Sequence, residues 1–204
     1  MSSTIDYYNQ HAREFSDTTR DVTFTDVQDR FLSLLPQGSY ILDFGCGSGR
    51  DTKYFLEQGY LVDAVDGSEE MCRIASEYTG IPVRHMYFED LCEIRKYDGI
   101  WACSSILHLN RSGLSDVLMK MEMSAKPGAI IYSSFKYGSY EGMRNGRYFI
   151  DFTEESFAGF MEDLHQQNRC LKTEIKEMWT TADVRPGRSD ERWLNILLQI
   201  LDRS

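Results

Sequence analysis

Three glycines at alternate positions follow a short apolar run that carries an aspartate. Gly45, Gly47 and Gly49 come directly after the run from Ile41 to Phe44, which contains Asp43. Because glycine tolerates a positive φ and lets a ligand approach the backbone closely, this spacing predicts a loop that wraps a bound molecule. A dinucleotide-binding turn has two more residues before its last glycine and receives a pyrophosphate, which a carboxylate here would repel. The loop therefore favours a ligand that carries positive charge.

A second acidic strand end follows about 20 residues later. The run from Leu61 to Val65 has the pattern of a strand, and Asp66 closes it before Gly67. S-adenosylmethionine carries an ammonium group and a sulfonium, so an acidic strand end with a glycine turn suits it better than NAD. The segment from Leu42 to Gly49, paired with this second acid, resembles the first two motifs of the class I S-adenosylmethionine-dependent methyltransferases.

The resemblance implies a cofactor site for S-adenosylmethionine, with S-adenosylhomocysteine as product. It places Asp43 toward the methionine ammonium group and Asp66 on the ribose hydroxyls. The thioether of Met71 could pack on the adenine ring, and core packing is the alternative. The family's third motif puts an acid near the adenine amino group, for which Asp90 is the first choice and Glu89 the second. The expected cofactor-binding residues are Tyr8, Asp43, Gly45, Cys46, Gly47, Gly49, Asp66, Gly67, Met71, Glu89, Asp90, Leu91 and Ser104.

The acceptor side of the site is expected after the fourth strand. Methyl transfer is an in-line displacement at an activated carbon, which requires a close, aligned nucleophile and no metal. His108 lies just beyond that strand, where open α/β sheets bind ligands, and its ordinary pKa suits a general base. The alternative is a histidine that only shapes the pocket.

Cations gather in the loops after the fifth strand. Lys136, Arg147 and Arg185 are the residues that we expect to recognise the acceptor, since guanidinium groups bind carboxylate or phosphate bidentately. The alternative is that the arginines of the last loop pair with its own acids, such as Asp183 and Glu191, as a structural loop.

The composition is that of one acidic globular domain. The chain has 204 residues and a formal net charge of -10. This balance disfavours wrapping of a nucleic-acid backbone, so we expect no nucleic-acid partner. The first residues carry no secretory signal and no stretch is long enough to cross a bilayer, so we expect a cytoplasmic protein without a membrane partner. Five scattered cysteines lack metal-ligand spacing, and we expect neither a disulfide nor a metal.

Short apolar runs alternate with helical patterns from residue 40 onward, which predicts an α/β fold. We expect a doubly wound, mostly parallel seven-stranded sheet with a C-terminal antiparallel hairpin, the Rossmann-like methyltransferase fold. Two helical patterns precede it, and the first carries Tyr8, Ala12 and Phe15 in a spacing that resembles the lid helix of small-molecule methyltransferases. Ordinary packing against the sheet is the alternative. The predicted strands are Tyr40 to Phe44, Leu61 to Val65, Val83 to Tyr87, Gly99 to Cys103 and Ala129 to Phe135, and the hairpin is Glu174 to Trp179 with Trp193 to Leu201.

These elements predict one methyltransferase domain over residues 1–204. Residues 1–36 form a helical lid, residues 37–135 the cofactor-binding core, and residues 136–204 the acceptor-side loops and the hairpin. The stretches Ser-Phe-Lys-Tyr-Gly and Asp-Val-Arg-Pro-Gly-Arg resemble the tellurite-resistance-type branch of the family.

The expected function is transfer of a methyl group to a small, possibly anionic, acceptor at oxygen, sulfur or nitrogen, by a monomer or homodimer. Two alternatives stay open. One is methylation of a nucleic acid or a protein, and the other is a non-catalytic S-adenosylmethionine-binding regulator.

Overall fold

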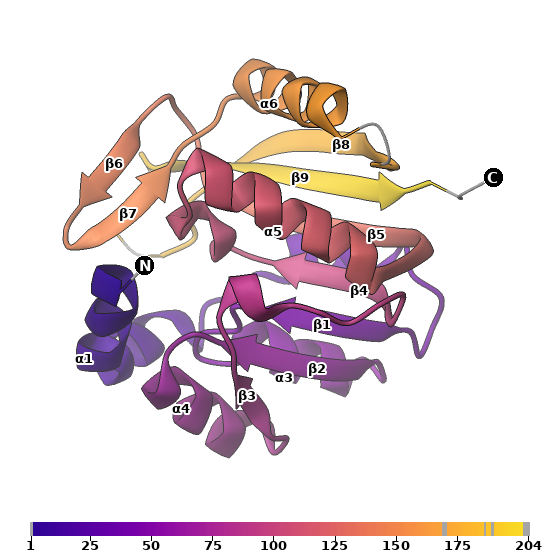
Figure 1. Cartoon of the computed structure of the whole chain (residues 1–204). Coiled ribbons are helices and arrows are strands. Elements are labelled where there is room, and N and C mark those ends of the chain that lie inside the picture. The colour runs from indigo at the N-terminus through magenta and orange to yellow at the C-terminus, as the bar shows by residue number, and fades with distance from the viewer. Residues whose placement is uncertain (1, 169–170, 186, 189, 202–204) are drawn as a thin grey trace.

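A seven-stranded sheet with the order β3-β2-β1-β4-β5-β9-β8 forms the centre of the computed structural model (Figure 1). The structure describes residues 2–168, 171–185, 187, 188 and 190–201, so that Cys170 and Pro186 lie outside the described residues. The strands of this sheet are β1 (Tyr40–Phe44), β2 (Leu61–Asp66), β3 (Val83–His85), β4 (Tyr97–Ala102), β5 (Ala125–Lys136), β8 (Thr173–Ala182) and β9 (Arg192–Ile200).

The five strands from β3 to β5 in this order run parallel, β9 runs in the opposite direction, and β8, which is antiparallel to β9, again runs with the first five. β1 pairs in parallel with both β2 and β4, and β4 pairs in parallel with β5. β9 pairs antiparallel with β5 and with β8. The predicted fold class is therefore confirmed, and the parallel strands all end at one edge, where an α/β sheet binds its ligands.

Two apolar layers cover the sheet. On one face, α2 (Thr25–Leu32) and α3 (Arg50–Glu57) pack on a cluster centred on Trp101, with Phe31 and Phe55 completely buried. On the other face, α5 (Arg111–Ser124) and α6 (Glu154–Gln167) cover a larger cluster that includes Phe135 and Phe157. Because both faces are buried, the central strands read as nearly continuous apolar runs.

Helix starts carry recognisable caps. Gly49 is the N-cap of α3, and the Ser68 side chain caps α4 (Glu69–Thr79) by accepting from the backbone N–H of Met71. Thr153 caps α6 in a capping box with Ser156. These side chains and the glycine fix where the three helices begin.

The structure contains one element that the sequence patterns did not predict. A separate antiparallel hairpin, β6 (Glu141–Arg144) with β7 (Arg147–Ile150), follows β5. Asn145 and Gly146 form its turn with φ values of 50° and 78°, as a type I′ turn requires. In Figure 1 this hairpin lies at the same end of the sheet as the N-terminal helix α1 (Ser2–Thr19).

Helix α1 packs on α4 and on β7. Thr4 accepts a hydrogen bond from the backbone of Tyr148 at 3.2 Å, and Asn9 accepts from the Ser68 hydroxyl at 2.6 Å. These contacts hold α1 across the carboxyl end of the sheet. None of the helices in the described part of the chain is long and apolar enough to span a membrane.

Candidate active site

A pocket lies at the carboxyl ends of β1, β2, β4 and β5, between α1, the β6–β7 hairpin and the β8–β9 loop. Side chains of α1 between Thr4 and Thr19 contribute to its wall, as do the end of β8 and residues 183 to 185 of the loop that follows it. The predicted site residues that line it are Tyr8, Gly45, Cys46, Gly47, Asp66, Gly67, Met71, Ser104, His108, Lys136, Arg147 and Arg185.

The glycine loop takes the backbone geometry that its residue types require. Gly45, Gly47 and Gly49 have φ values of 86°, 54° and 82°. A Cβ on Gly45 would stand 2.5 Å from the Cβ of Ser105, whereas one on Gly47 would meet nothing closer than Phe15 at 3.7 Å. Gly45 is therefore needed for close packing against Ser105, whereas the backbone of Gly47 is accessible from the pocket.

Asp66 fastens this loop to the end of β2. Its Oδ2 accepts the backbone N–H of Gly47 and its Oδ1 accepts that of Ser68, each at 2.9 Å. Burial raises the pKa of Asp66 against the opposing effect of these two donors. A carboxylate oxygen has two lone pairs, so each oxygen keeps one acceptor position for a hydroxyl of a bound diol. The residue therefore fits a ribose.

Asp43 does not line the pocket. It is buried under α3, where its Oδ2 accepts the Thr52 hydroxyl at 2.5 Å. Burial, reinforced by repulsion from Asp51, raises the pKa of Asp43 to about 8. Gly49 also lies outside the wall, and a Cβ there would stand 2.8 Å from Cγ2 of Thr79. Both residues are thus placed to hold the loop and α3 together.

The third predicted motif also lies outside the lining. Glu89 and Asp90 are exposed on the 3₁₀ turn η1 (Phe88–Asp90), and Leu91 is buried in the core. The wall beside the glycine loop is apolar instead, with Met71, Met86 and Phe88. Sequence reasoning missed the last two because nothing in their spacing sets them apart from core residues.

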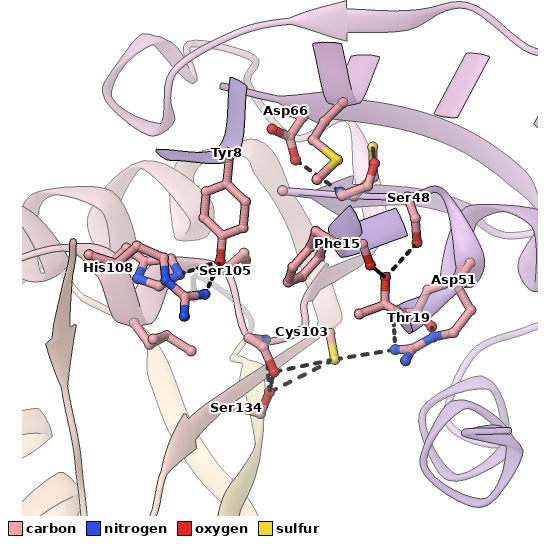
Figure 2. A pocket seen from close by; sticks show the side chains of 18 of the residues that line it. Tyr8, Phe15, Thr19, Ser48, Asp51, Asp66, Cys103, Ser105, His108 and Ser134 are labelled. Carbon is pink, nitrogen blue, oxygen red and sulfur yellow. Dashed lines mark hydrogen bonds and ion pairs between the residues drawn. The ribbon is translucent and has the colours of Figure 1, made fainter. Parts of the chain in front are cut away.

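Helix α1 covers this part of the pocket. A Cβ on Gly67 would stand 2.7 Å from Ile5, and the rings of Tyr8 and Phe15 meet edge to face with centroids 5.2 Å apart. Ala12 is buried in the same cluster as Met71. In Figure 2 the side chains of Tyr8 and Phe15 both point into the pocket. Helix α1 therefore lies over the pocket, and its action as a lid stays a prediction.

A hydrogen-bonded chain joins α1 to the wall near β7. His108, in the 3₁₀ turn η2 (Ile106–His108), places Nδ1 2.7 Å from the carbonyl oxygen of Tyr148, so Nδ1 carries the proton. Its Nε2 then accepts the Tyr8 hydroxyl at 2.9 Å (Figure 2), and Nη1 of Arg147 donates to that hydroxyl at 3.2 Å. Burial lowers the pKa of His108 to about 4. The imidazole is neutral and its lone pair is engaged, so the predicted role as a base requires Tyr8 to move.

A polar group of small side chains lies where β4 and β5 end. Ser104 has a φ of 52°, an uncommon left-handed conformation for a serine. Its backbone N–H donates to the Ser134 hydroxyl at 2.9 Å, and Cys103 lies between Ser134 and Arg50 (Figure 2). Burial raises the pKa of the Cys103 thiol to about 12. The thiol is therefore protonated at neutral pH.

The loop cations reach the pocket, and most of them have acidic partners there. Lys136 pairs with Glu191, and Arg185 binds Asp183 through Nε at 2.9 Å and through Nη2 at 2.5 Å. This pairing holds the pKa of Asp183 at about 2 against its burial. These cations therefore line the pocket, as predicted. They also pair with acidic side chains of the last loop, which was the alternative.

Arg147 differs from these cations. It forms no ion pair with any carboxylate among the residues that the structure describes. Its guanidinium carbon lies 4.6, 5.6 and 5.2 Å from the ring centroids of Tyr7, Tyr8 and Phe149.

No three His, Cys, Asp or Glu side chains of the described chain come together as a metal site.

Comparison with known proteins finds similarity to methyltransferases. The model of a methyltransferase domain matches residues 41–128. The 18S rRNA (guanine-N(7))-methyltransferase of Schizosaccharomyces pombe is 29% identical over 140 residues, which cover 61% of this chain and 52% of that protein. An uncharacterized methyltransferase of Geobacillus is 25% identical over 184 residues, which cover 88% and 80%. The chain thus spans about half the length of the first of these relatives.

A solved structure shows the same fold. Burkholderia thailandensis 1,6-didemethyltoxoflavin-N1-methyltransferase, with bound 1,6-didemethyltoxoflavin and S-adenosylhomocysteine, superposes with a TM-score of 0.77 at 20% identity. The match covers 98% of this chain and 88% of that one. Membership of the tellurite-resistance branch stays a prediction. The matched domain, the fold and the loop held by Asp66 agree with the class I S-adenosylmethionine-dependent methyltransferases, whose cofactor is S-adenosylmethionine.

Proposed function

We propose that this methyltransferase acts on a small acceptor molecule at oxygen, sulfur or nitrogen. The observation that carries the proposal is the cover over the pocket. Three segments form the pocket wall around the glycine loop: helix α1, the β6–β7 hairpin and the β8–β9 loop. A site enclosed by three segments suits a compact acceptor, because it excludes water and aligns the nucleophile.

The cofactor side of this proposal assigns roles to residues of this chain. S-adenosylmethionine supplies an electrophilic methyl group. Asp66 would hold the ribose, the open backbone of Gly47 would lie against the methionine part, and Met71 with Phe88 would flank the adenine. Residues 1–36 would act as the lid, since Tyr8 and Phe15 project from α1 over the glycine loop.

The acceptor side carries a surplus of positive charge. Lys136, Arg147, Arg185 and Arg188 line it, whereas among the residues that the structure describes Asp183 and Glu191 are the carboxylates that pair with them. Four cations against two carboxylates favour an acceptor with negative charge. The basic side chains predicted for acceptor recognition therefore keep that role in the proposal.

Calorimetric titration tests the cofactor step first. We expect S-adenosylmethionine and S-adenosylhomocysteine to bind and NAD not to bind. Methyl transfer from labelled S-adenosylmethionine is then measured on a small-molecule extract and, separately, on total RNA. The rRNA methyltransferase among the relatives makes RNA the informative competitor. Transfer to RNA alone would overturn the small-molecule proposal, and cofactor binding without any transfer would favour the regulator.

A further inference from the structure

The carboxylates and the imidazole of the pocket wall are either engaged in hydrogen bonds or lie on the cofactor side. Among the described residues that line it, these groups are Asp51, Asp66, Asp183 and His108. Asp51 accepts four hydrogen bonds, two from Arg50, one from Gln28 at 2.7 Å and one from Trp101 at 2.8 Å. A carboxylate with about four acceptor positions is then saturated.

The remaining groups are occupied or lie on the cofactor side. Asp183 accepts three bonds from Arg185 and one from the Trp193 indole. Asp66 lies at the glycine loop on the cofactor side, and the lone pair of His108 accepts the Tyr8 hydroxyl. The described lining therefore presents no carboxylate or imidazole with a free lone pair toward the acceptor side. A nucleophile that must lose a proton during transfer has no ready base in this arrangement.

Arg147 is a cation without an anion in the same part of the pocket. Its Nε is buried and has no hydrogen-bond partner among the described residues. One hydrogen bond from Nη1, to the Tyr8 hydroxyl, is its polar contact within the described chain. Because a partly buried charge without a counter-charge is costly, and three aromatic rings offset this only in part, the site favours a ligand with negative charge.

We propose that the acceptor is a small organic anion, that Arg147 is its counter-ion, and that the methyl group goes to an atom without a proton. This rests on the proposed methyltransferase function and names its substrate class. Carboxylates, thiolates and deprotonated nitrogen heterocycles share this chemistry. His108 is then a positioning residue, which holds Tyr8 beside Arg147.

The reaction balances without a base. A lone pair of the acceptor anion forms the bond to the methyl carbon, the bond between that carbon and sulfur breaks, and its electron pair stays on sulfur. The anionic charge and the sulfonium charge disappear together, and no proton is released. Apolar surroundings favour a step that removes two opposite charges, because they solvate the full charges of the reactants poorly, whereas the transition state, in which both charges are partly neutralised, loses less solvation. Phe15, Phe149 and Trp193 supply such surroundings in the wall.

The test uses benzoate and its neutral analogue benzamide as probes of the protein saturated with S-adenosylhomocysteine. We expect the wild type to prefer benzoate by about tenfold or more, and Arg147→Gln to lose this preference. Arg144→Gln is the matched control, because Arg144 faces Arg147 across the hairpin turn but pairs with Asp151 outside the pocket. It should keep the preference.

Three results would overturn the inference: no binding of benzoate, equal binding of both probes by the wild type, or an unchanged preference in Arg147→Gln. If Arg147→Gln does not fold, Arg147→Lys keeps the charge and should keep part of the preference. Failure to bind S-adenosylhomocysteine in the first place would instead refute the proposed function.

A second arm addresses the base. Methyl transfer is measured on the fraction of a small-molecule extract that an anion exchanger retains, at pH 6 to 9. Because Gln can still accept the Tyr8 hydroxyl but cannot take a proton, we expect His108→Gln to retain activity within about tenfold, with an unchanged pH profile. A loss of about a hundredfold or more together with a changed profile would restore His108 as a general base and overturn this part of the inference.

Discussion

The Tyr8 hydroxyl of α1 donates to Nε2 of His108 at 2.9 Å, and this bond connects the N-terminal helix to the wall beside β4. The two residues are 100 positions apart in the sequence. His108 is fixed from its other side by the carbonyl of Tyr148, so the imidazole is held at both nitrogens. The fixed imidazole of His108 therefore holds α1 in its position over the pocket.

Removal of the Tyr8 hydroxyl should loosen this helix. Tyr8→Phe deletes one buried hydrogen bond and leaves His108 with an unsatisfied acceptor, which costs about 1–3 kcal/mol of helix docking. We expect a weaker affinity for S-adenosylhomocysteine and faster hydrogen exchange of α1. The ring of the neighbouring Tyr7 stacks on His11, and Tyr7→Phe is the matched control. Equal effects of the two variants would contradict a specific role for the Tyr8 hydroxyl.

The pH dependence of stability should report the neutral state of His108. Its pKa is lowered from an ordinary value of 6.5 to about 4, so the unfolded chain binds a proton that the native chain does not. The stabilisation is complete above pH 6.5 and is lost as the pH falls toward 4, by about 3 kcal/mol in total. Asp43, with a pKa raised to about 8, changes stability in the opposite direction as the pH rises.

Denaturant unfolding between pH 4 and 8 therefore compares the wild type with His108→Gln. The difference between the two curves isolates the histidine, because Asp43 contributes equally to both. We expect this difference to shrink as the pH falls from 6.5 to 4. A constant difference over that range would show that His108 titrates normally in the folded protein.

Alanine substitutions in the glycine loop should separate an effect on folding stability from an effect on cofactor affinity. Gly45→Ala places a Cβ 2.5 Å from Ser105 in a left-handed conformation, so we expect a loss of folding stability of about 2 kcal/mol or more. Gly47→Ala carries the cost of a left-handed alanine but meets no atom closer than 3.7 Å, so it should lose less stability than Gly45→Ala, and its larger effect should be on cofactor affinity. Thermal unfolding and calorimetry of both variants measure the two effects. The reverse assignment would mean that the ligand approaches Gly45.

The fold was predictable because its signals are local and repeated. Alternating apolar strands and capped helices give the order of elements, and the glycine loop with Asp66 marks the cofactor end. The hairpin after β5 also carries a local signal, since Asn145 and Gly146 favour a type I′ turn. Its strands have only four residues each, which is too short for a clear alternation of apolar and polar side chains.

The sequence patterns could not predict contacts between segments that lie far apart in the chain. The partner of Tyr8 depends on how α1 crosses the sheet, and no spacing encodes a bond to His108. The predicted adenine acids failed to reach the pocket lining for a similar reason. The short strand β3 ends at His85, two residues earlier than expected, and η1 then turns Glu89 and Asp90 to the surface.

Replacement of Asp66 by asparagine should affect the loop and the ligand together. The carboxylate of Asp66 accepts from the backbones of both Gly47 and Ser68, whereas an asparagine must direct its NH₂ group at one of these N–H donors. It also loses acceptor positions for the ribose. We expect affinity for S-adenosylhomocysteine to fall by about tenfold to a hundredfold, since two charge-assisted hydrogen bonds are weakened. Glu70→Gln, an exposed substitution on the adjacent helix α4 that removes the same charge, is the control and should bind normally. If Asp66→Asn bound as tightly as Glu70→Gln, Asp66 would not hold the ribose.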